Sequence, residues 1–489
     1  MFTSRIANFQ RGAIALLLLM VVGLGVAGAI LAGFSHHMFK LYRDQQTQSV
    51  LAEAKQILLA EALSKRGNTV PITRPGEFFC PDRNVQGEAS YGQSGLNGAA
   101  CAGAAARIGR IPWLNYQAAE LRDSSGEPLW MAVVDGFQER RNVPLNSDTA
   151  PTGVNPWFQA AANNGGQSLS SAEDPVVVVI LAPGAALGGQ NRNTAAQQRN
   201  PNNYFECNRL TVGGTCLGVP NNYANYNLTQ GRFLDGPRLD SSTNPTLNDR
   251  IITIRRSELL APLEKRAAKE YQQLLNLWAV QVIPALGGLP NPASPADAGC
   301  ADIAAVNSNG CIPDPATCRG RAPKSIALTG VGLAPVLPGY LVNPLNRPAS
   351  VPNQADWQRV LLEYDWLYRN RWEQVFFYAV ANTTSCPLPL ALQLRNMQLP
   401  AGVVNAVMIG AGVAKTGQMR ALAADKMLLN NYLDLVPSYV VAPDINRRAW
   451  DILPPQADQY AKLGAADAGN DRLYHRVGVQ WVEAMKDRP

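Results

Sequence analysis

The residue types able to carry catalysis are few in this chain and are poorly spaced for it. His36 and His37 are neighbours, and His475 lies near the end of the chain. This spacing fits neither a HExxH zinc motif nor a catalytic triad. Residues 410–416, GAGVAKT, differ from a phosphate-binding loop because Ala414 stands where that loop requires glycine before the lysine.

Two further segments fit loops better than active sites. Residues 92–95, GQSG, are one residue short of a nucleophile elbow. Asp82, Asn84 and Gln86 place oxygen atoms at alternate positions before Gly87, as a calcium loop does. The intervening arginine and the missing downstream glutamate favour a solvated turn instead. The sequence therefore predicts a protein that is not an enzyme, with no catalytic residue, cofactor or metal site, and it leaves calcium near Asp82 open.

Composition and charge limit the partners. The 489-residue chain has a formal net charge of +6, only 16% of its residues are charged, and its Lys and Arg residues are scattered. A basic groove for nucleic acid is not indicated, so nucleic acid is not an expected partner. This length, with 46% apolar residues, predicts two packed domains joined by linkers.

The cysteines suggest an oxidising compartment. None of them has CxxC spacing, which disfavours a zinc ribbon or a thioredoxin-like redox site. Close pairs such as Cys80 with Cys101 and Cys207 with Cys216 could close short loops, whereas unpaired buried thiols in a cytosolic protein are the alternative. The eight candidate disulfide cysteines are Cys80, Cys101, Cys207, Cys216, Cys300, Cys311, Cys318 and Cys386.

An uncharged N-terminal segment predicts a membrane helix. Residues 13–34 carry no charged side chain, and the segment is close to the ~20 residues that a helix needs to cross the hydrocarbon core. Arg5 and Arg11 precede it, which favours a cytoplasmic N-terminus, although Lys40 and Arg43 follow it. Apolar residues then recur at three- and four-residue steps, which predicts that the helix continues as an amphipathic rod to about Gly67.

Residues 10–13, QRGA, which open onto IALLLLM, resemble a prepilin leader. The resemblance implies that a prepilin peptidase cleaves after Gly12 and that the new N-terminal amine, on Ala13, is methylated. The fifth mature residue is usually glutamate, whereas this chain has Leu17. Minor subunits at a pseudopilus tip also lack this glutamate. A secretory signal peptide and an uncleaved signal anchor are the alternatives, and all three would export the remainder of the chain.

Five pairs of matching segments recur in the same order along the exported region. VVVVILAPGAALGGQNR at 176–192 matches VVNAVMIGAGVAKTGQMR at 403–420, and both end in Gly-Gln-x-Arg. The other pairs are CPD at 80–82 with CIPD at 311–314, LWMAV at 129–133 with FFYAV at 376–380, NNYFE at 202–206 with NNYLD at 430–434, and NDR at 248–250 with NDR at 470–472. Five matches in order predict two copies of one module.

The predicted fold class is α+β: a long N-terminal transmembrane and amphipathic helix followed by two tandem pilin-like modules, each a helix packed on an antiparallel β-sheet. Short β-branched or aromatic runs at 130–134, 176–181, 251–254, 376–380 and 403–409 predict core strands. The expected divisions are a leader at 1–12, the transmembrane and amphipathic helix at 13–67, a first module at 68–255, the helix that opens the second module at 256–285, a linker at 286–308 and a second module at 309–489.

Further segments, RPGEFFCPD, RIGRIPW and NDRIITIRRSELL, are similar to those of large pseudopilin-like proteins of Gram-negative bacteria. The resemblance implies a minor subunit, located at the tip of a type IV pilus or type II secretion pseudopilus, that acts by assembly and binding. It implies an inner-membrane location with a periplasmic C-terminal region. The implied partners are other pilin or pseudopilin subunits, the prepilin peptidase, and the membrane through the N-terminal helix. The alternative is a membrane-tethered periplasmic binding or scaffold protein that never enters a filament.

Overall fold

A computed structural model describes the secondary structure of both halves of the chain. The described residues are 20–23, 40–65, 74–94, 101, 103–139, 144–149, 157–162, 168–171, 174–207, 223–229, 231–239, 245–277, 289–294, 300, 311, 319–323, 366–367, 370–380, 393–395, 404–415, 418–420, 422–428, 431–433, 459–461 and 472–483.

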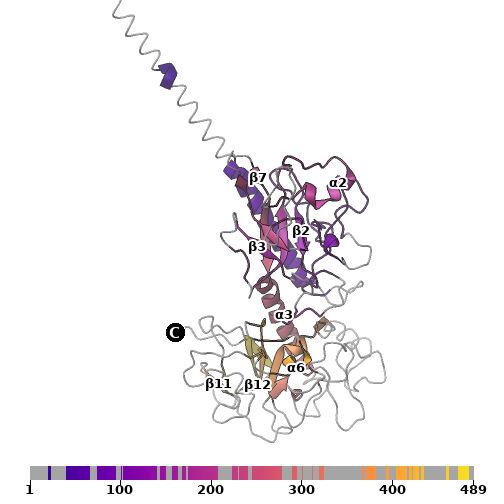
Figure 1. Ribbon diagram of the computed structural model, residues 1–489. Helices are drawn as coiled ribbons and strands as arrows, with labels where there is room; N and C mark the ends of the chain where they lie inside the picture. Colours follow the sequence, from indigo (N-terminus) through magenta and orange to yellow (C-terminus); the bar gives the residue numbers. More distant parts are fainter. Residues whose placement is uncertain are drawn as a thin grey trace, which may run out of the picture.

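Two antiparallel sheets organise the described chain. One has four strands in the order β1-β2-β4-β8, and the other has five in the order β15-β14-β12-β10-β9. Figure 1 shows the first sheet in the upper part of the molecule and the second in the lower part, with helix α3 between them. The strands of the first sheet are β1 Ile108–Arg110, β2 Trp130–Val133, β4 Val176–Ala182 and β8 Arg250–Arg255, and those of the second are β9 Arg319–Arg321, β10 Phe376–Val380, β12 Val404–Gly410, β14 Arg472–Val477 and β15 Gln480–Glu483.

Shorter elements surround the sheets. Two-stranded pairings join β3 with β5, β6 with β7 and β11 with β13. The bounds are β3 Gln159–Ala161, β5 Arg232–Leu234, β6 Arg238–Leu239, β7 Pro245–Leu247, β11 Gln393–Arg395, β13 Gln459–Ala461, α2 Ala195–Arg199, α6 Ala423–Lys426, and the 3₁₀ turns η1 Ala104–Ala106, η3 Pro201–Asn203 and η7 Trp372–Gln374. Thr194 caps α2 with a capping box, which explains why so short a helix begins there.

The central strands are buried on both faces. Every residue of β2, β4 and β10 is buried, so these strands are continuous apolar runs without alternation. The Val176–Val179 run suits such a position because β-branched side chains pack well on a pleated surface. The five predicted core strands are confirmed as β2, β4, β8, β10 and β12.

The two sheets repeat one another in register. β4 pairs with β8 from Val176↔Arg255 to Ala182↔Arg250, and β12 pairs with β14 from Val404↔Val477 to Gly410↔Arg472. Each ladder has one irregularity, after its first residue, between Val176 and Val178 and between Val404 and Ala406. Segments that match in sequence therefore occupy matching places in the two sheets. Among the described strands the sheets differ at one edge, where β14 pairs with β15 while β8 is the last strand of its sheet.

Two long helices pack on the sheets. Residues 40–64 form a helix whose apolar side chains Leu51, Ala54 and Leu58 are fully buried in the core, which confirms the amphipathic rod over this range. The second predicted helix is confirmed as α3, Arg256–Leu277, which begins directly after β8. Lys55 pairs with Glu258 at 2.6 Å, so the two helices are in contact.

Helix α3 contacts both halves. On the first half, Arg256 donates from Nη2 to the Ser147 carbonyl oxygen at 2.7 Å. On the second half, Glu270 accepts from Nε1 of Trp366 at 2.6 Å, and the Tyr271 ring lies 5.9 Å from that of Phe376. The helix therefore packs as a shared support between the two sheets.

The fold class was wrong in its transmembrane helix and its pilin-like modules. A helix needs about 20 consecutive apolar residues to span the hydrocarbon core. Only residues 20–23 of the first helical segment are described, and the helix at 40–64 carries charged residues such as Arg43, Asp44 and Lys55. Among the described residues none of the helices is long and apolar enough to cross a membrane, and these residues form a mixed α/β structure with few helices.

The inner-membrane location with a periplasmic C-terminal region is corrected on the same finding, because it rested on a helical anchor that the described residues do not contain. Residues 13–19 and 24–39 of the expected anchor lie outside the described residues, as do Gly12 and Ala13.

Candidate functional site

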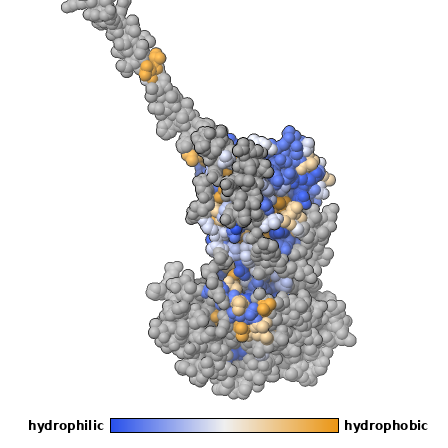
Figure 2. All heavy atoms as spheres, viewed as in Figure 1, coloured by the Kyte–Doolittle hydropathy of each residue, from blue (hydrophilic) through white to orange (hydrophobic). Residues whose placement is uncertain are grey.

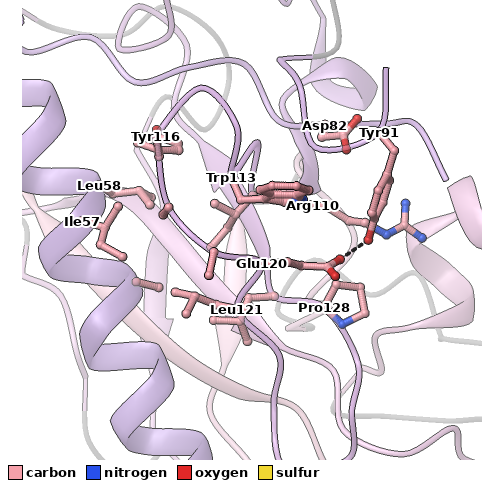
Figure 3. A pocket seen from close by; sticks show the side chains of 15 residues that line it. Ile57, Leu58, Asp82, Tyr91, Arg110, Trp113, Tyr116, Glu120, Leu121 and Pro128 are labelled. Carbon is pink, nitrogen blue, oxygen red and sulfur yellow. Dashed lines mark hydrogen bonds between the residues drawn. The ribbon is translucent and has the colours of Figure 1, made fainter. Parts of the chain in front are cut away.

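A small cavity lies between the helix at 40–64 and the strand and loop at residues 110–129 (Figure 3). Ile57 and Leu58 line one side from the helix, and Trp113 and Tyr91 line another. Its volume is about 10 Å³, which is room for one water molecule. The Tyr91 hydroxyl donates to the Glu120 carboxylate, and burial raises the pKa of Tyr91, so the phenol stays protonated. The cavity is thus a narrow gap in the packing, and its Tyr91 and Glu120 side chains are bonded to each other.

Asp82 fastens the loop beside this cavity. Its Oδ1 accepts from the backbone N–H and the side-chain amide of Asn84, each at 2.8 Å, and its Oδ2 accepts from the Gly92 N–H at 2.7 Å. Burial raises the pKa of Asp82, and these N–H donors act in the opposite direction. Donors that point at both oxygens leave little room for a cation. Across the described ranges no group of three or more His, Cys, Asp or Glu could hold a metal ion.

The repeated Gly-Gln-x-Arg motif makes one arginine cluster in each half. In the first half the Arg192 guanidinium lies 4.3 Å from the Tyr204 ring and donates to the Asn203 carbonyl at 2.8 Å and to Gln190 Oε1 at 3.0 Å. In the second half Arg420 lies 4.3 Å from the Tyr432 ring and donates to the Asn431 carbonyl and, at 2.9 Å, to Gln418 Oε1. The arginines also donate to Gly184 and Gly412 carbonyl oxygens, so the motif anchors the Asn-Asn-Tyr segment to the turn that follows the strand.

The acidic partner of the arginine comes from the same half of the chain in one cluster and from the other half in the second. Glu127 pairs with Arg192 at 2.7 Å within the first half. Arg420 instead pairs at 3.2 Å with Asp148, which lies in the described segment 144–149 of the first half. Asp148 also accepts from Lys426 Nζ at 3.2 Å and from the Tyr432 hydroxyl at 2.8 Å. The second cluster is thus completed by a residue of the other half.

Asp148 is ionised in this setting. Burial is the largest effect and raises the pKa, but the charges of Arg420 and Lys426 and the hydrogen bonds together hold the pKa of Asp148 below its ordinary value. The side chains of Arg420, Lys426 and Asp148 are 3%, 6% and 4% exposed, so the ions compensate one another inside the protein.

A second buried acid site pairs Glu206 with Asp249. Asp249 Oδ2 accepts from the Glu206 N–H at 3.0 Å and from the Asn225 amide at 2.9 Å. Glu206 accepts from the Gln190 amide at 2.6 Å and from the Asn248 N–H at 3.1 Å. Burial raises the pKa of Glu206 to about 7, and burial followed by repulsion from Glu206 raises that of Asp249 well above its usual range. Such a pair retains a proton at neutral pH.

The cysteines are disulfide-bonded where the structure describes them. Cys80–Cys101 is confirmed, with Cα atoms 5.8 Å apart, and Cys300–Cys311 joins residues 4.4 Å apart. Cys207 is disulfide-bonded too. The remaining candidates, Cys216, Cys318 and Cys386, lie outside the described residues.

The other sequence motifs are structural where they are described. The Gly412 N–H, in the glycine-rich turn after β12, donates to Oε1 of Glu264 at 3.2 Å. A carboxylate therefore stands where a phosphate would have to bind. His475 lies on β14, and burial lowers the pKa of its imidazole. His36 and His37 lie outside the described residues.

Sequence reasoning missed both buried acid sites. Glu206 and Asp249 stand inside the repeated segments NNYFE and NDR, so an acid in each repeat was an available signal. Asp148 stands in no repeated segment, and only the packing of the two halves brings it to Arg420.

Comparisons with protein-family models, with curated proteins and with solved structures found no match to this chain.

Proposed function

We propose that the protein is a minor pilin-like subunit that acts by assembly and binding and not by catalysis. The observation that carries this proposal is an apolar turn of helix left in solvent. Met20, Val21 and Val22 are 61%, 60% and 56% exposed. Figure 1 shows this indigo turn clear of the sheets, and Figure 2 shows it as an orange, apolar patch.

An apolar helix surface in water favours a partner that covers it. The small residues nearby in the sequence, among them Gly23, Gly25 and Gly28, suit close approach of a second helix. The resemblance of the QRGA junction to a prepilin leader supports other pilin-like subunits as that partner, because their N-terminal helices pack together in a filament.

The helix at 40–64 divides into an exposed start and a packed remainder. Leu41 and Tyr42 are 57% and 67% exposed, whereas Leu51 and Leu58 are fully buried on the first sheet. The buried part fixes the helix to the body, and the exposed start adds an apolar and an aromatic side chain that are open to solvent. This division suits a subunit that projects one helix toward its neighbours.

The polar clusters support a binding protein over an enzyme. The cavity beside Tyr91 has room for one water molecule, and the arginine and carboxyl clusters are filled by their own hydrogen-bond partners. A catalytic site requires a nucleophile or base that can reach a substrate.

Two measurements test the proposal. Mass spectrometry of the protein purified from cells should show loss of the first twelve residues and a methylated Ala13, and Gly12→Val should prevent this processing. Co-purification with pilin-like subunits should be lost in Val22→Asp and retained in the matched control Val22→Ile. An intact Met1, or Val22→Asp that retains the same partners as the wild type, would refute the proposal.

A further inference from the structure

One turn of the second half is apolar where the matching turn of the first half is polar. Residues 417–434, GQMRALAADKMLLNNYLD, align without a gap with residues 189–206, GQNRNTAAQQRNPNNYFE. Helix α6 begins at Ala423, which is the position that matches Ala195 at the start of α2. The two turns therefore share their local structure, and their exposed side chains can be compared position by position.

Three exposed positions of the second turn carry apolar side chains, which together are called the α6 patch. Met419, Leu422 and Leu428 are 64%, 66% and 55% exposed. The matching residues of the first half are the exposed polar side chains Asn191, Thr194 and Asn200. Figure 2 shows blue, hydrophilic surface where Figure 1 places α2, and orange atoms in the lower half, which contains α6. One exposed apolar residue is ordinary, but three at positions that are polar in the matching turn indicate a contact surface.

Two of the apolar side chains stand where the first half has caps. Thr194 Oγ1 accepts from the Gln197 N–H at 3.3 Å, and Asn200 Oδ1 accepts from the Asn202 N–H at 3.1 Å. The leucines at the matching positions of the second half have no polar side-chain atom, and leucine is among the poorest N-cap residues. The stability of the turn therefore does not explain these leucines.

The α6 patch is continuous around one short helix. The Met419 N–H donates to Asn431 Oδ1 at 3.2 Å, and the Asn431 N–H donates to the Leu428 carbonyl oxygen at 3.1 Å. Asn431 thus holds the two ends of the turn together. Leu422 lies between them at the start of α6.

The charged residues of this turn are engaged within the protein. Arg420 and Lys426 are each 5% exposed, and both contact the Asp148 carboxylate. Asp425 accepts from the Leu422 N–H at 3.3 Å. Because interface cores are depleted in charged residues, such a surface suits an uncharged apolar occupant and not an acidic or basic one.

The chain itself contains an occupant of this kind. Met20, Val21 and Val22 are 61%, 60% and 56% exposed, and residues 13–34 carry no charged side chain. Figure 1 shows this turn beyond the first half, whereas α6 lies in the second half at the other end of the molecule. A contact between the two surfaces therefore joins two copies. Three side chains are also too few for the roughly 800 Å² per partner that a stable pair of folded bodies buries, which favours a single helix as the occupant.

We infer that the α6 patch of one copy binds the apolar N-terminal segment, residues 13–34, of a second copy in a head-to-tail contact. One contact of this kind covers both exposed apolar surfaces of the chain, and it can propagate from copy to copy because the two surfaces differ. The inference deepens the proposed function, on which it rests for the role of Met20–Val22 as an assembly surface, and it names the partner and the surface that receives this turn.

Sedimentation of the purified full-length protein, without detergent and over a wide range of concentration, tests the contact. The wild type should associate as its concentration rises. The variant Met419→Asn, Leu422→Thr, Leu428→Asn carries the first-half residues and regains their caps, so it should unfold in urea no earlier than the wild type. It should nevertheless associate about tenfold or more weakly, because three buried apolar side chains are lost from the contact.

Two further variants identify the occupant. Val22→Asp should weaken association to the same extent, whereas Leu114→Thr, which changes a side chain of the first half that is 45% exposed, should associate like the wild type. A photo-reactive benzoylphenylalanine in place of Leu422, in a mixture of isotope-labelled and unlabelled copies, should crosslink to residues 13–34 of the other copy.

A wild type that stays monomeric, or unchanged association in the triple variant or in Val22→Asp, overturns the inference. Crosslinks to residues 419–428 of the second copy would show a symmetric contact and would also overturn it. The assay contains no other subunit, so its failure is distinct from failure of the co-purification and processing tests of the proposed function.

Discussion

Replacement of Asp148 by asparagine should destabilise the protein by about 3–5 kcal/mol, the range for breaking a buried ion pair. The carboxylate is 4% exposed and contacts Arg420 Nη1 at 3.2 Å and Lys426 Nζ at 3.2 Å. Asparagine preserves the shape but removes the negative charge, which leaves two buried cations without their acid. The loss should appear in the second half, because both cations belong to it.

The assay is urea unfolding of the wild type and Asp148→Asn at pH 7. Asp44→Asn is a suitable control, because the Asp44 side chain is 47% exposed and its partner Arg250 also contacts Asp235. That control should change the free energy of unfolding by no more than about 1 kcal/mol. If Asp148→Asn also costs less than about 1 kcal/mol, the two halves do not depend on this ion cluster.

The same cluster gives a pH dependence. The pKa of Asp148 in the folded protein lies below its ordinary value, while the unfolded chain has a value of about 3.9. The contribution of Asp148 is therefore complete above about pH 4 and is lost as the pH falls through the folded pKa. The difference in stability between the wild type and Asp148→Asn should shrink over that acidic range, and a constant difference would contradict this assignment.

Three other changes probe the first half. Because burial raises the pKa of Glu206 to about 7 and that of Asp249 well above its usual range, wild-type stability in urea unfolding should be lower at pH 8 than at pH 5. Glu206→Gln should reduce this difference without abolishing it, because Asp249 remains buried. The double variant Cys80→Ala, Cys101→Ala should lose about 3 kcal/mol in thermal unfolding, since the bridge closes a loop with a sequence separation of 21, and reduction of the wild type should give a similar loss. Gly92→Ala should lower the free energy of unfolding by about 1–3 kcal/mol, because Gly92 has φ +83° and an added Cβ would lie 2.5 Å from the Trp113 ring. The matched control is Gly87→Ala, because Gly87 has φ +96° but open space around it, so this variant has the backbone strain without the clash.

The strand positions could be predicted from the local sequence. The run of four valines from Val176 and the aromatic run from Phe376 both became fully buried strands, because a short β-branched or aromatic run favours the sheet core wherever it is placed. The helix at 40–64 and α3 were readable for the same kind of reason, since their apolar spacing repeats every three to four residues. The transmembrane helix was wrong, since no helix among the described residues is long and apolar enough to cross a membrane, and uncharged composition over residues 13–34 does not by itself establish one.

The buried sites could not be predicted in the same way, because they depend on contacts between residues that are far apart in the sequence. Arg420 and Asp148 are separated by 272 residues, and no local pattern links them. The Asp82 oxygens are engaged by Asn84 and Gly92, which the calcium-like spacing alone did not reveal.

The sequence by itself determined the strands, the two long helices and the order of the matching segments, because each is set by the periodicity and propensity of neighbouring residues. Only the tertiary structure decided that Asp148 completes the cluster of the other half and that Glu206 and Asp249 share a buried site. It also decided that, among the described strands, β14 has an outer partner in β15 while β8 has none. These features arise from the burial of charges and backbone groups brought together by packing, and the energy of such groups depends on the surroundings that the whole fold creates.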